Sequence, residues 1–257
     1  MLCSSSSSKL NRAFHSLEEN NKSLNWEERI SLMRAYFDMN GNRYWVVISE
    51  FNTKMGPVPS FSTPSVITCP KGLPCYGACY ARAYEEKRDT VHLSYCNNLK
   101  MLLEFPDIVR DKIVAYINLN TPPYFRFSVS GDVEVDCLRP FLYINLIISV
   151  AKKCPKTKIL VFTKSSLWNE VKTLPRNLKV VYSNWKDWKV DNPVKKNGEP
   201  RFPTVNIMDK KEDKGDRIIC PNSINKSHHC INCHKCWDMK STETIFFYTH
   251  GIHKNKA

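Results

Sequence analysis

Residues 124–136 read YFRFSVSGDVEVD, a largely apolar segment that runs directly into a polar loop containing a glycine. Apolar and aromatic residues that give way to Ser, Gly and Asp predict a buried strand at Tyr124–Ser130 followed by a loop. Two later segments have the same character, KILVFTK at Lys158–Lys164 and NLKVVYSNW at Asn177–Trp185. All three are apolar on both faces, as strands of a parallel sheet covered on both sides should be.

Helical segments are predicted between these strands. A largely apolar helix follows the first strand, with Pro140 near its first turn, where proline is tolerated. A short helix that Ser165 and Ser166 can cap runs through Thr173 after the second strand. This alternation predicts right-handed crossovers and a parallel sheet. We therefore expect an α/β fold, either a partial (β/α) barrel or an open parallel sheet, with an inserted cysteine-rich metal-binding lobe over residues 218–240.

The N-terminal part of the chain is expected to contain a leader, a helix and a strand. Residues 1–25 include a serine run and predict a mobile leader, whereas residues 26–257 are expected to form a single α/β domain. Apolar residues at helical spacing predict an amphipathic helix over 26–39, and YWVVIS predicts a strand at Tyr44–Ser49.

The remaining segments place helices before residue 124 and a last strand near the end of the chain. Residues 77–118 are predicted to be mostly helical, with interruptions near Asp89 and at Pro106. The polar residues 186–217, with several lysines and prolines, predict a long loop or an insertion. The sequence ETIFFYTH at Glu243–His250 predicts another strand.

Composition and charge place the chain among ordinary globular proteins. Of its 257 residues, 42% are hydrophobic and 25% charged, which argues against a disordered chain, and its length excludes a disulfide-held miniprotein. The net charge of +13 favours an anionic partner such as nucleic acid, although interleaved basic and acidic residues are typical of a solvated surface. The longest apolar stretch, Phe141–Ala151, is too short to span a bilayer, and no secretory signal begins the chain. We expect a cytoplasmic protein with no membrane partner.

Seven of the eleven cysteines fall into two groups, and the C-terminal group is the denser. In a reducing compartment such groups usually bind metal. The segment CPNSINKSHHCINCHKCW has the spacing C-x9-C-x2-C-x2-C, formed by Cys220, Cys230, Cys233 and Cys236. A triple C-x2-C run with one distant cysteine is typical of cubane iron–sulfur sites, whereas structural zinc more often uses two separated pairs. The spacing therefore predicts a 4Fe-4S cluster. The alternatives are zinc, aided by the nearby histidines, and thiols that are unliganded or linked in disulfides.

The N-terminal group of cysteines has a different spacing, and more than one role is compatible with it. The segment TCPKGLPCYGACYARAY spaces Cys69, Cys75 and Cys79 as C-x5-C-x3-C. Three cysteines on a loop that enters a helix could hold three irons of a cubane and leave the fourth free to bind S-adenosylmethionine. Cys137 could instead supply a fourth ligand, or the three thiols could be small buried hydrophobes. The chain is accordingly expected to hold one or two clusters.

Polar residues follow the predicted strands, at the end of a parallel sheet where ligands usually bind. Ser130, Gly131 and Asp132 come after the first quoted strand and Lys164 after the second. The strand at Tyr44–Ser49 is followed by the polar residues Glu50, Asn52, Thr53 and Lys54. The Asp carboxylate could bind a ligand amine or hydroxyl, and the lysine a carboxylate or phosphate. Helix capping and loop closure are the alternative roles for such residues.

The order of these motifs resembles that of the phage-encoded gene product 88 family. A cysteine-rich loop ending in CYA, a strand followed by SGD, a strand ending in TKSS and a final C-x2-C-x2-C-W carry the resemblance, over roughly residues 44–240. The family has no firmly established activity, and its layout is similar to that of radical S-adenosylmethionine proteins. By that resemblance the loop with Cys69, Cys75 and Cys79 matches the cluster loop, and the SGD tripeptide matches the ligand-binding strand end. The C-x5-C-x3-C spacing of this chain differs from the C-x3-C-x2-C spacing that is usual in radical S-adenosylmethionine enzymes.

Three functions follow from these patterns. The first is a phage-encoded iron–sulfur protein, a redox or radical enzyme of unknown substrate, in which an electron donor reduces the C-terminal cluster and that cluster reduces the N-terminal one. The second is a zinc-stabilised basic protein that binds nucleic acid or has a structural role. The third is a degenerate barrel whose single cluster is structural or senses redox state.

Overall fold

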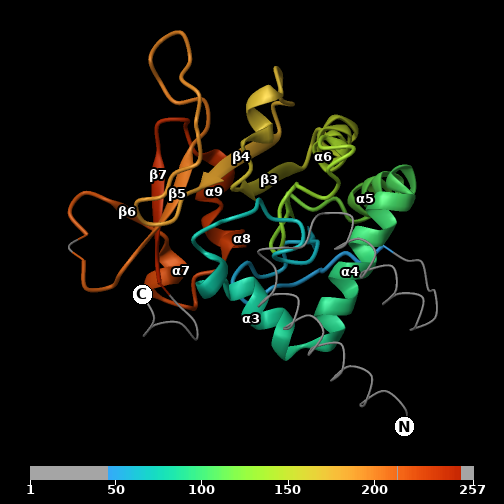
Figure 1. Cartoon of the computed structure of the whole chain (residues 1–257), viewed down its shortest axis with the longest axis horizontal. Helices are drawn as coiled ribbons and strands as arrows, with labels where there is room; N and C mark the ends of the chain where they lie inside the picture. The colour runs from blue at the N-terminus through green and yellow to red at the C-terminus, as the bar shows by residue number, and fades with distance from the viewer. Residues whose placement is uncertain (1–45, 213, 250–257) are drawn as a thin grey trace.

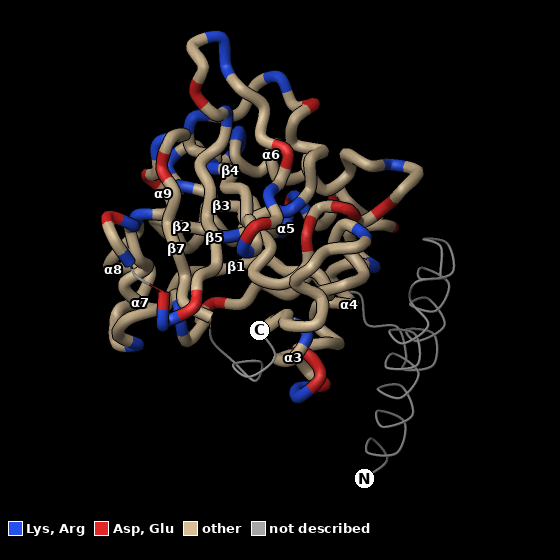
Figure 2. Tube along the Cα trace, turned by 60° about the vertical axis from the view of Figure 1, so that its left-hand side comes forward, with Lys and Arg blue, Asp and Glu red and all other residues tan. Residues whose placement is uncertain are grey.

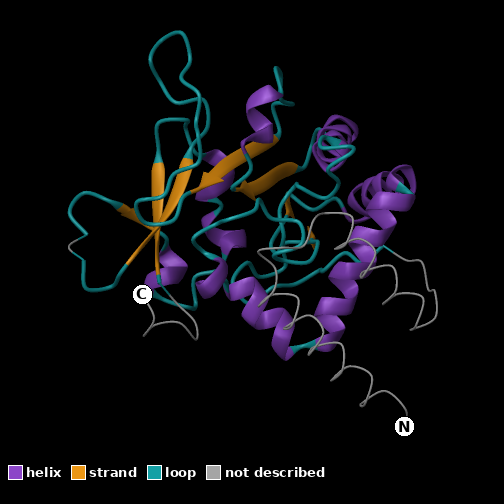
Figure 3. Cartoon of the chain, in the orientation of Figure 1, coloured by secondary structure: helices purple, strands orange, loops and turns teal. Residues whose placement is uncertain are grey.

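The chain folds around one open parallel sheet, in a computed structural model that describes residues 46–212 and 214–249. Within those residues the sheet has seven strands in the order β1-β2-β3-β4-β5-β7-β6, and every neighbouring pair is parallel (Figure 3). The strands are β1 (Ser60–Phe61), β2 (Tyr124–Phe127), β3 (Lys158–Thr163), β4 (Leu178–Ser183), β5 (Thr204–Met208), β6 (Ile218–Ile219) and β7 (Thr244–Tyr248). The predicted α/β fold is confirmed, in its open-sheet form; the sheet does not close into a barrel.

Helices connect the strands as the sequence indicated. The bounds are η1 (Tyr76–Ala78), α3 (Tyr80–Lys87), α4 (Asp89–Glu104), α5 (Pro106–Asn120), α6 (Leu142–Lys153), η2 (Ser166–Glu170), α7 (Pro221–Ile224), α8 (Cys230–Cys233) and α9 (Lys235–Asp238). The predicted interruptions are confirmed: Arg88 separates α3 from α4, and Phe105 separates α4 from α5, which has Pro106 in its first turn. Ser165 caps η2 by accepting a hydrogen bond from the backbone N–H of Leu167.

Both faces of the sheet are covered, because successive strand residues point to opposite sides. On β2 and β3, Phe125, Phe127, Ile159 and Val161 pack in one apolar cluster with residues of α4, α5 and α6. Leu160, between them in sequence, belongs to a second cluster with residues of β7 and of the cysteine-rich C-terminal segment. In Figure 1, α4, α5 and α6 lie together at the right, whereas α7–α9 lie closer to β5 and β7. The cysteine-rich lobe thus covers the sheet face that the main helices leave free.

The region predicted as a long loop, residues 186–217, contains a strand of the sheet, so that prediction is wrong in part. The strand is β5, which pairs with β4 through Thr204 and Val205 and with β7 along its whole length. It is only five residues long, it has two buried positions, and prolines precede it, so its apolar signal is weak.

The start of the described chain also differs from the prediction. No strand spans residues 46–49; Ser49 instead forms an isolated antiparallel bridge with Ser60, with N···O distances of 2.9 and 2.8 Å. Among the described residues, the first strand of the sheet is therefore the two-residue β1. The predicted leader at 1–25 and the predicted helix at 26–39 lie outside the described residues.

The distribution of surface charge concerns the predicted nucleic-acid partner, and the length of the helices concerns the predicted absence of a membrane partner. Figure 2 shows Lys and Arg distributed over several sides of the described chain, with Asp and Glu among them. Among the described helices, none combines the length and the apolar character needed to cross a bilayer.

Candidate metal centres

The C-terminal cysteines come from three short elements that follow β6. Cys220 comes directly after β6, and its N–H donates to the carbonyl of Phe246 in β7 at 2.8 Å. Cys230 and Cys233 are the first and last residues of α8, and Cys236 lies in α9. The residue between these helices, His234, has φ +39°, a left-handed conformation that turns the chain between them. The C-x2-C-x2-C spacing thus spans two short helical turns at an angle.

Backbone and aromatic contacts fix this lobe to the sheet. The N–H groups of Cys230 and Ile231 donate to the carbonyls of Lys54 and Met55 at 3.3 and 3.1 Å. The indole N–H of Trp237 donates to the carbonyl of Phe125 at 3.4 Å. The Trp237 ring also packs against Tyr124, with ring centroids 5.1 Å apart. The lobe is therefore held from both the residue 54–55 turn and β2.

All four C-terminal cysteines line one cavity between the lobe and the sheet. The cavity has a volume of about 550 Å³, including the part open to solvent, and its far wall is formed by side chains of the sheet: Arg126, Leu160, Phe162, Ile245 and Phe247. Within the described residues, no group of three or more His, Cys, Asp or Glu side chains is gathered closely enough to hold a single metal ion. A cubane binds each cysteine through a different iron, so it takes sulfurs spread around a cavity. The four thiols of the donor set fit a cluster of that kind.

Two of these thiols, Cys230 and Cys236, are partly buried, and desolvation favours their protonated form. Burial raises the pKa of Cys236 to about 12 and also raises the pKa of Cys230, while Lys54 and Arg126 oppose both shifts. A bound metal deprotonates its thiol ligands, so it would turn these groups into thiolates. The cations then become their natural counter-charges.

The N-terminal cysteine loop begins a few residues after β1 and ends at the start of α3. Cys69 and Cys79 are partly exposed and Cys75 is buried. Burial raises the pKa of all three thiols, that of Cys75 to about 11; Cys79 raises the pKa of Cys69 and Cys75 further, and Cys75 also raises that of Cys69. Asp132 raises the pKa of Cys69 and Cys75, and Lys164 lowers that of Cys75 and Cys79. These five predicted site residues therefore lie close enough to influence one another's charge.

The Ser-Gly-Asp turn links this loop to the strand ends. Gly131 has φ +72°, and a Cβ there would stand 2.4 Å from the hydroxyl oxygens of Thr63 and Thr68. The N–H of Asp132 donates to the Thr68 hydroxyl at 3.0 Å, and its carboxylate accepts from the Thr163 hydroxyl at 2.6 Å and the Lys164 N–H at 2.7 Å. Burial raises the pKa of Asp132 to about 6. In the described structure this carboxylate ties the end of β2 to the end of β3.

Lys164 reaches across to the next strand. Its Nζ donates to the carbonyl and the hydroxyl of Ser183, at the end of β4, at 2.6 and 2.7 Å. Burial lowers its pKa, although the nearby cysteines and Asp132 oppose the shift. Two of the remaining predictions fall elsewhere: Lys54 lines the C-terminal cavity rather than this edge, and Cys137 is exposed in the loop after Asp136.

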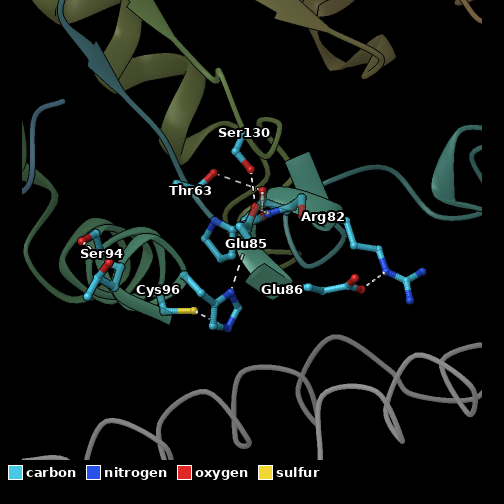
Figure 4. A network of polar contacts seen from close by, with 12 residues as sticks. Thr63, Arg82, Glu85, Glu86, Ser94, Cys96 and Ser130 are labelled. Atoms are coloured by element: carbon cyan, nitrogen blue, oxygen red, sulfur yellow. Dashed lines mark hydrogen bonds and ion pairs between the residues drawn. The ribbon is translucent and has the colours of Figure 1, made fainter. Parts of the chain in front are cut away.

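Ser130 is part of a buried polar network that sequence reasoning missed. Its hydroxyl donates to Glu85 Oε1 at 2.5 Å, and the N–H of Ser65 donates to the same oxygen at 3.0 Å. The other oxygen of Glu85 lies 3.1 Å from His92 Nδ1, whose Nε2 lies 3.4 Å from the Cys96 sulfur (Figure 4). No sequence spacing pairs residues of α3 and α4 with a strand end, so only the fold reveals this network.

The geometry defines an α/β protein with an open parallel sheet and two separate groups of cysteines, one at the ends of strands and one over a sheet face. A family model described as Gene product 88 matches residues 8–240, and the chain belongs to this family. The family resemblance inferred from the motifs is thereby confirmed. Neither the curated proteins nor the solved structures contain a match to the chain.

Proposed function

We propose that this protein is an iron–sulfur protein that holds a 4Fe-4S cluster in the C-terminal cavity. One observation carries the proposal: four cysteines line a single cavity, and the buried Arg126 and the half-buried Lys54 line it beside them. A buried positive charge is costly without an anion. Thiolates around a cluster supply that anion, and neutral thiols do not.

The N-terminal group supports a second cluster with a catalytic role. Its three cysteines lie beside Ser130, Gly131, Asp132 and Lys164 at the carboxyl ends of parallel strands, where ligands of α/β proteins bind. Three thiolates would leave one iron open for S-adenosylmethionine. With an electron relayed from an external donor through the C-terminal cluster, such a centre supplies the electron that breaks a carbon–sulfur bond of that cofactor. In this proposal the protein is a redox or radical enzyme.

Metal analysis of the full chain, purified without oxygen, tests the C-terminal cluster. We expect a brown protein with iron and acid-labile sulfide in equal amounts, and Cys233→Ala should lose iron. The matched control is Cys154→Ala, which removes a buried thiol that packs in the other apolar cluster. Zinc in place of iron, or equal iron in both variants, would reject the C-terminal cluster.

The N-terminal centre needs its own test. The reduced protein, given S-adenosylmethionine, should release 5′-deoxyadenosine, and Cys75→Ala should abolish that release while keeping the iron of the C-terminal cavity. If the protein binds iron but releases no 5′-deoxyadenosine, the proposed radical reaction is rejected, and the cluster serves electron transfer or has a structural role.

A further inference from the structure

Two cations, the half-buried Lys54 and the buried Arg126, stand on rigid backbone at the wall of the C-terminal cavity. Lys54 lies in a tight turn in which Asn52 and Gly56 exchange backbone hydrogen bonds of 3.1 and 2.7 Å, and Asn52 Oδ1 also accepts from the Lys54 N–H at 2.9 Å. Arg126 is the third residue of β2, a central strand paired with β1 and β3. Neither position can move without disturbing the sheet or the turn.

The surroundings of these cations contain aromatic rings and sulfur. Lys54 Nζ lies 4.1 Å from the centroid of the Phe247 ring, and the Arg126 guanidinium carbon lies 4.5 Å from that of Phe162. Arg126 Nη1 lies 3.6 Å from the sulfur of Met55, and its Nε is buried with no hydrogen-bond partner among the described residues.

Apart from Arg126, the ionisable groups that influence the pKa of Lys54 are the thiols of the C-terminal cysteines. Cys220, Cys230 and Cys236 raise its pKa, while burial and the neighbouring Arg126 lower it. Within the described part of the chain, no Asp or Glu forms an ion pair with either cation. Two adjacent cations without a carboxylate repel each other, and the burial of Arg126 adds a desolvation cost, so an anion in the cavity would stabilise both.

We propose that Lys54 and Arg126 are positioning residues that supply the counter-charge of the C-terminal cluster and raise its reduction potential; this inference rests on the proposed function. A cubane with four thiolates is an anion, and one-electron reduction adds a further negative charge. Fixed positive charges therefore stabilise the reduced form more than the oxidised form. A cluster beside these two positive charges accepts an electron from a donor more readily than the same cluster in a cavity lined only by apolar side chains.

Lys54 gives the cleaner test of the two. The Arg126 guanidinium also lies near the hydroxyl of Tyr80, where it opposes the effect of burial on the Tyr80 pKa, and Tyr80 follows Cys79 of the N-terminal group. Replacing Arg126 would therefore disturb both cysteine groups. Lys54 is influenced by the C-terminal cysteines alone among the thiols.

The experiment is a redox titration of the full chain, purified without oxygen and followed by electron paramagnetic resonance. Lys54→Met should make the one-electron reduction of the C-terminal cluster about tenfold less favourable, which is a fall in potential of about 59 mV. Lys54→Arg keeps the charge and should stay near the parent potential. The control is Lys179→Met, since Lys179 is a half-buried lysine that donates to the lobe carbonyl of Met239 at 2.6 Å without lining the cavity.

Each outcome separates the inference from the function on which it rests. Iron with an unchanged potential in Lys54→Met overturns the counter-charge role and leaves the cluster in place. Loss of iron from Lys54→Met with retention in Lys54→Arg supports the role, and loss from both overturns it. Parent protein that binds no iron, or binds zinc, overturns the proposed function and this inference together.

Discussion

Replacing Gly131 with alanine should destabilise the fold far more than the same change at Gly72. Both glycines have φ +72°, so both substitutions place a Cβ in a left-handed conformation. At Gly131 the new Cβ would stand 2.4 Å from two threonine hydroxyl oxygens and 2.7 Å from the backbone oxygen of Thr63, whereas at Gly72 no atom lies within 4 Å. The pair therefore separates backbone strain from the close packing of the turn against residues 63 and 68.

The expected magnitudes follow from these two terms. A left-handed conformation costs an alanine about 1–2 kcal/mol relative to glycine, and this is the whole expected loss for Gly72→Ala. Gly131→Ala adds overpacking of about 1–3 kcal/mol, because one of the three contacts is backbone and cannot rotate away. The total of about 2–5 kcal/mol is a large part of the stability of an ordinary domain.

Equilibrium unfolding in urea measures both losses in the free energy of unfolding. The parent and the two variants should be compared at equal iron content, since Gly72 lies in the loop between Cys69 and Cys75. Equal losses for the two variants would refute the close approach of the Ser-Gly-Asp turn to Thr63 and Thr68. That result would also remove the connection between the N-terminal cysteine loop and the strand ends.

Three further substitutions test other contacts. Asp132→Asn should lower the free energy of unfolding in urea by about 1–3 kcal/mol. The carboxylate accepts hydrogen bonds from the Thr163 hydroxyl and the Lys164 N–H, and the NH₂ group of an asparagine would face one of these donors. Glu85→Ala should lower the free energy of unfolding by about 2–4 kcal/mol, because it leaves buried donors unpaired. Glu86→Ala on the same helix removes an ion pair with Arg82 that is largely solvated, so it should change the free energy of unfolding by less than about 1 kcal/mol. Similar losses for the two variants would contradict the buried network. Trp237→Ala should cost about 3–5 kcal/mol and release iron from the C-terminal cavity, and a variant with parent stability and iron content would show that the lobe does not depend on this contact.

The long apolar strands could be predicted from sequence, and the short ones could not. β2, β3, β4 and β7 each carry enough consecutive apolar residues to identify them. β1 has two residues, and β5 owes its place to pairing with both neighbours rather than to its own composition. A short strand inside a sheet is stabilised by partners that are distant in sequence, so its own residues carry little signal.

The cysteine groups could be recognised from spacing, but their electrostatic setting could not. Arg126 offered one signal, since a charged residue stood within a segment predicted to be buried on both faces. Lys54 was expected at the strand ends beside the N-terminal loop, and the fold turns it instead towards the C-terminal cysteines. The Glu85–His92 contact depends on the angle between α3 and α4, which no spacing encodes.

The most direct test of the central proposal is a crystal structure of the protein prepared without oxygen, with anomalous scattering recorded on both sides of the iron edge. The proposal predicts strong iron density in the cavity bounded by Cys220, Cys230, Cys233 and Cys236, bonded to all four sulfurs. A cavity without iron, or a single zinc ion bound by some of these residues, would contradict it.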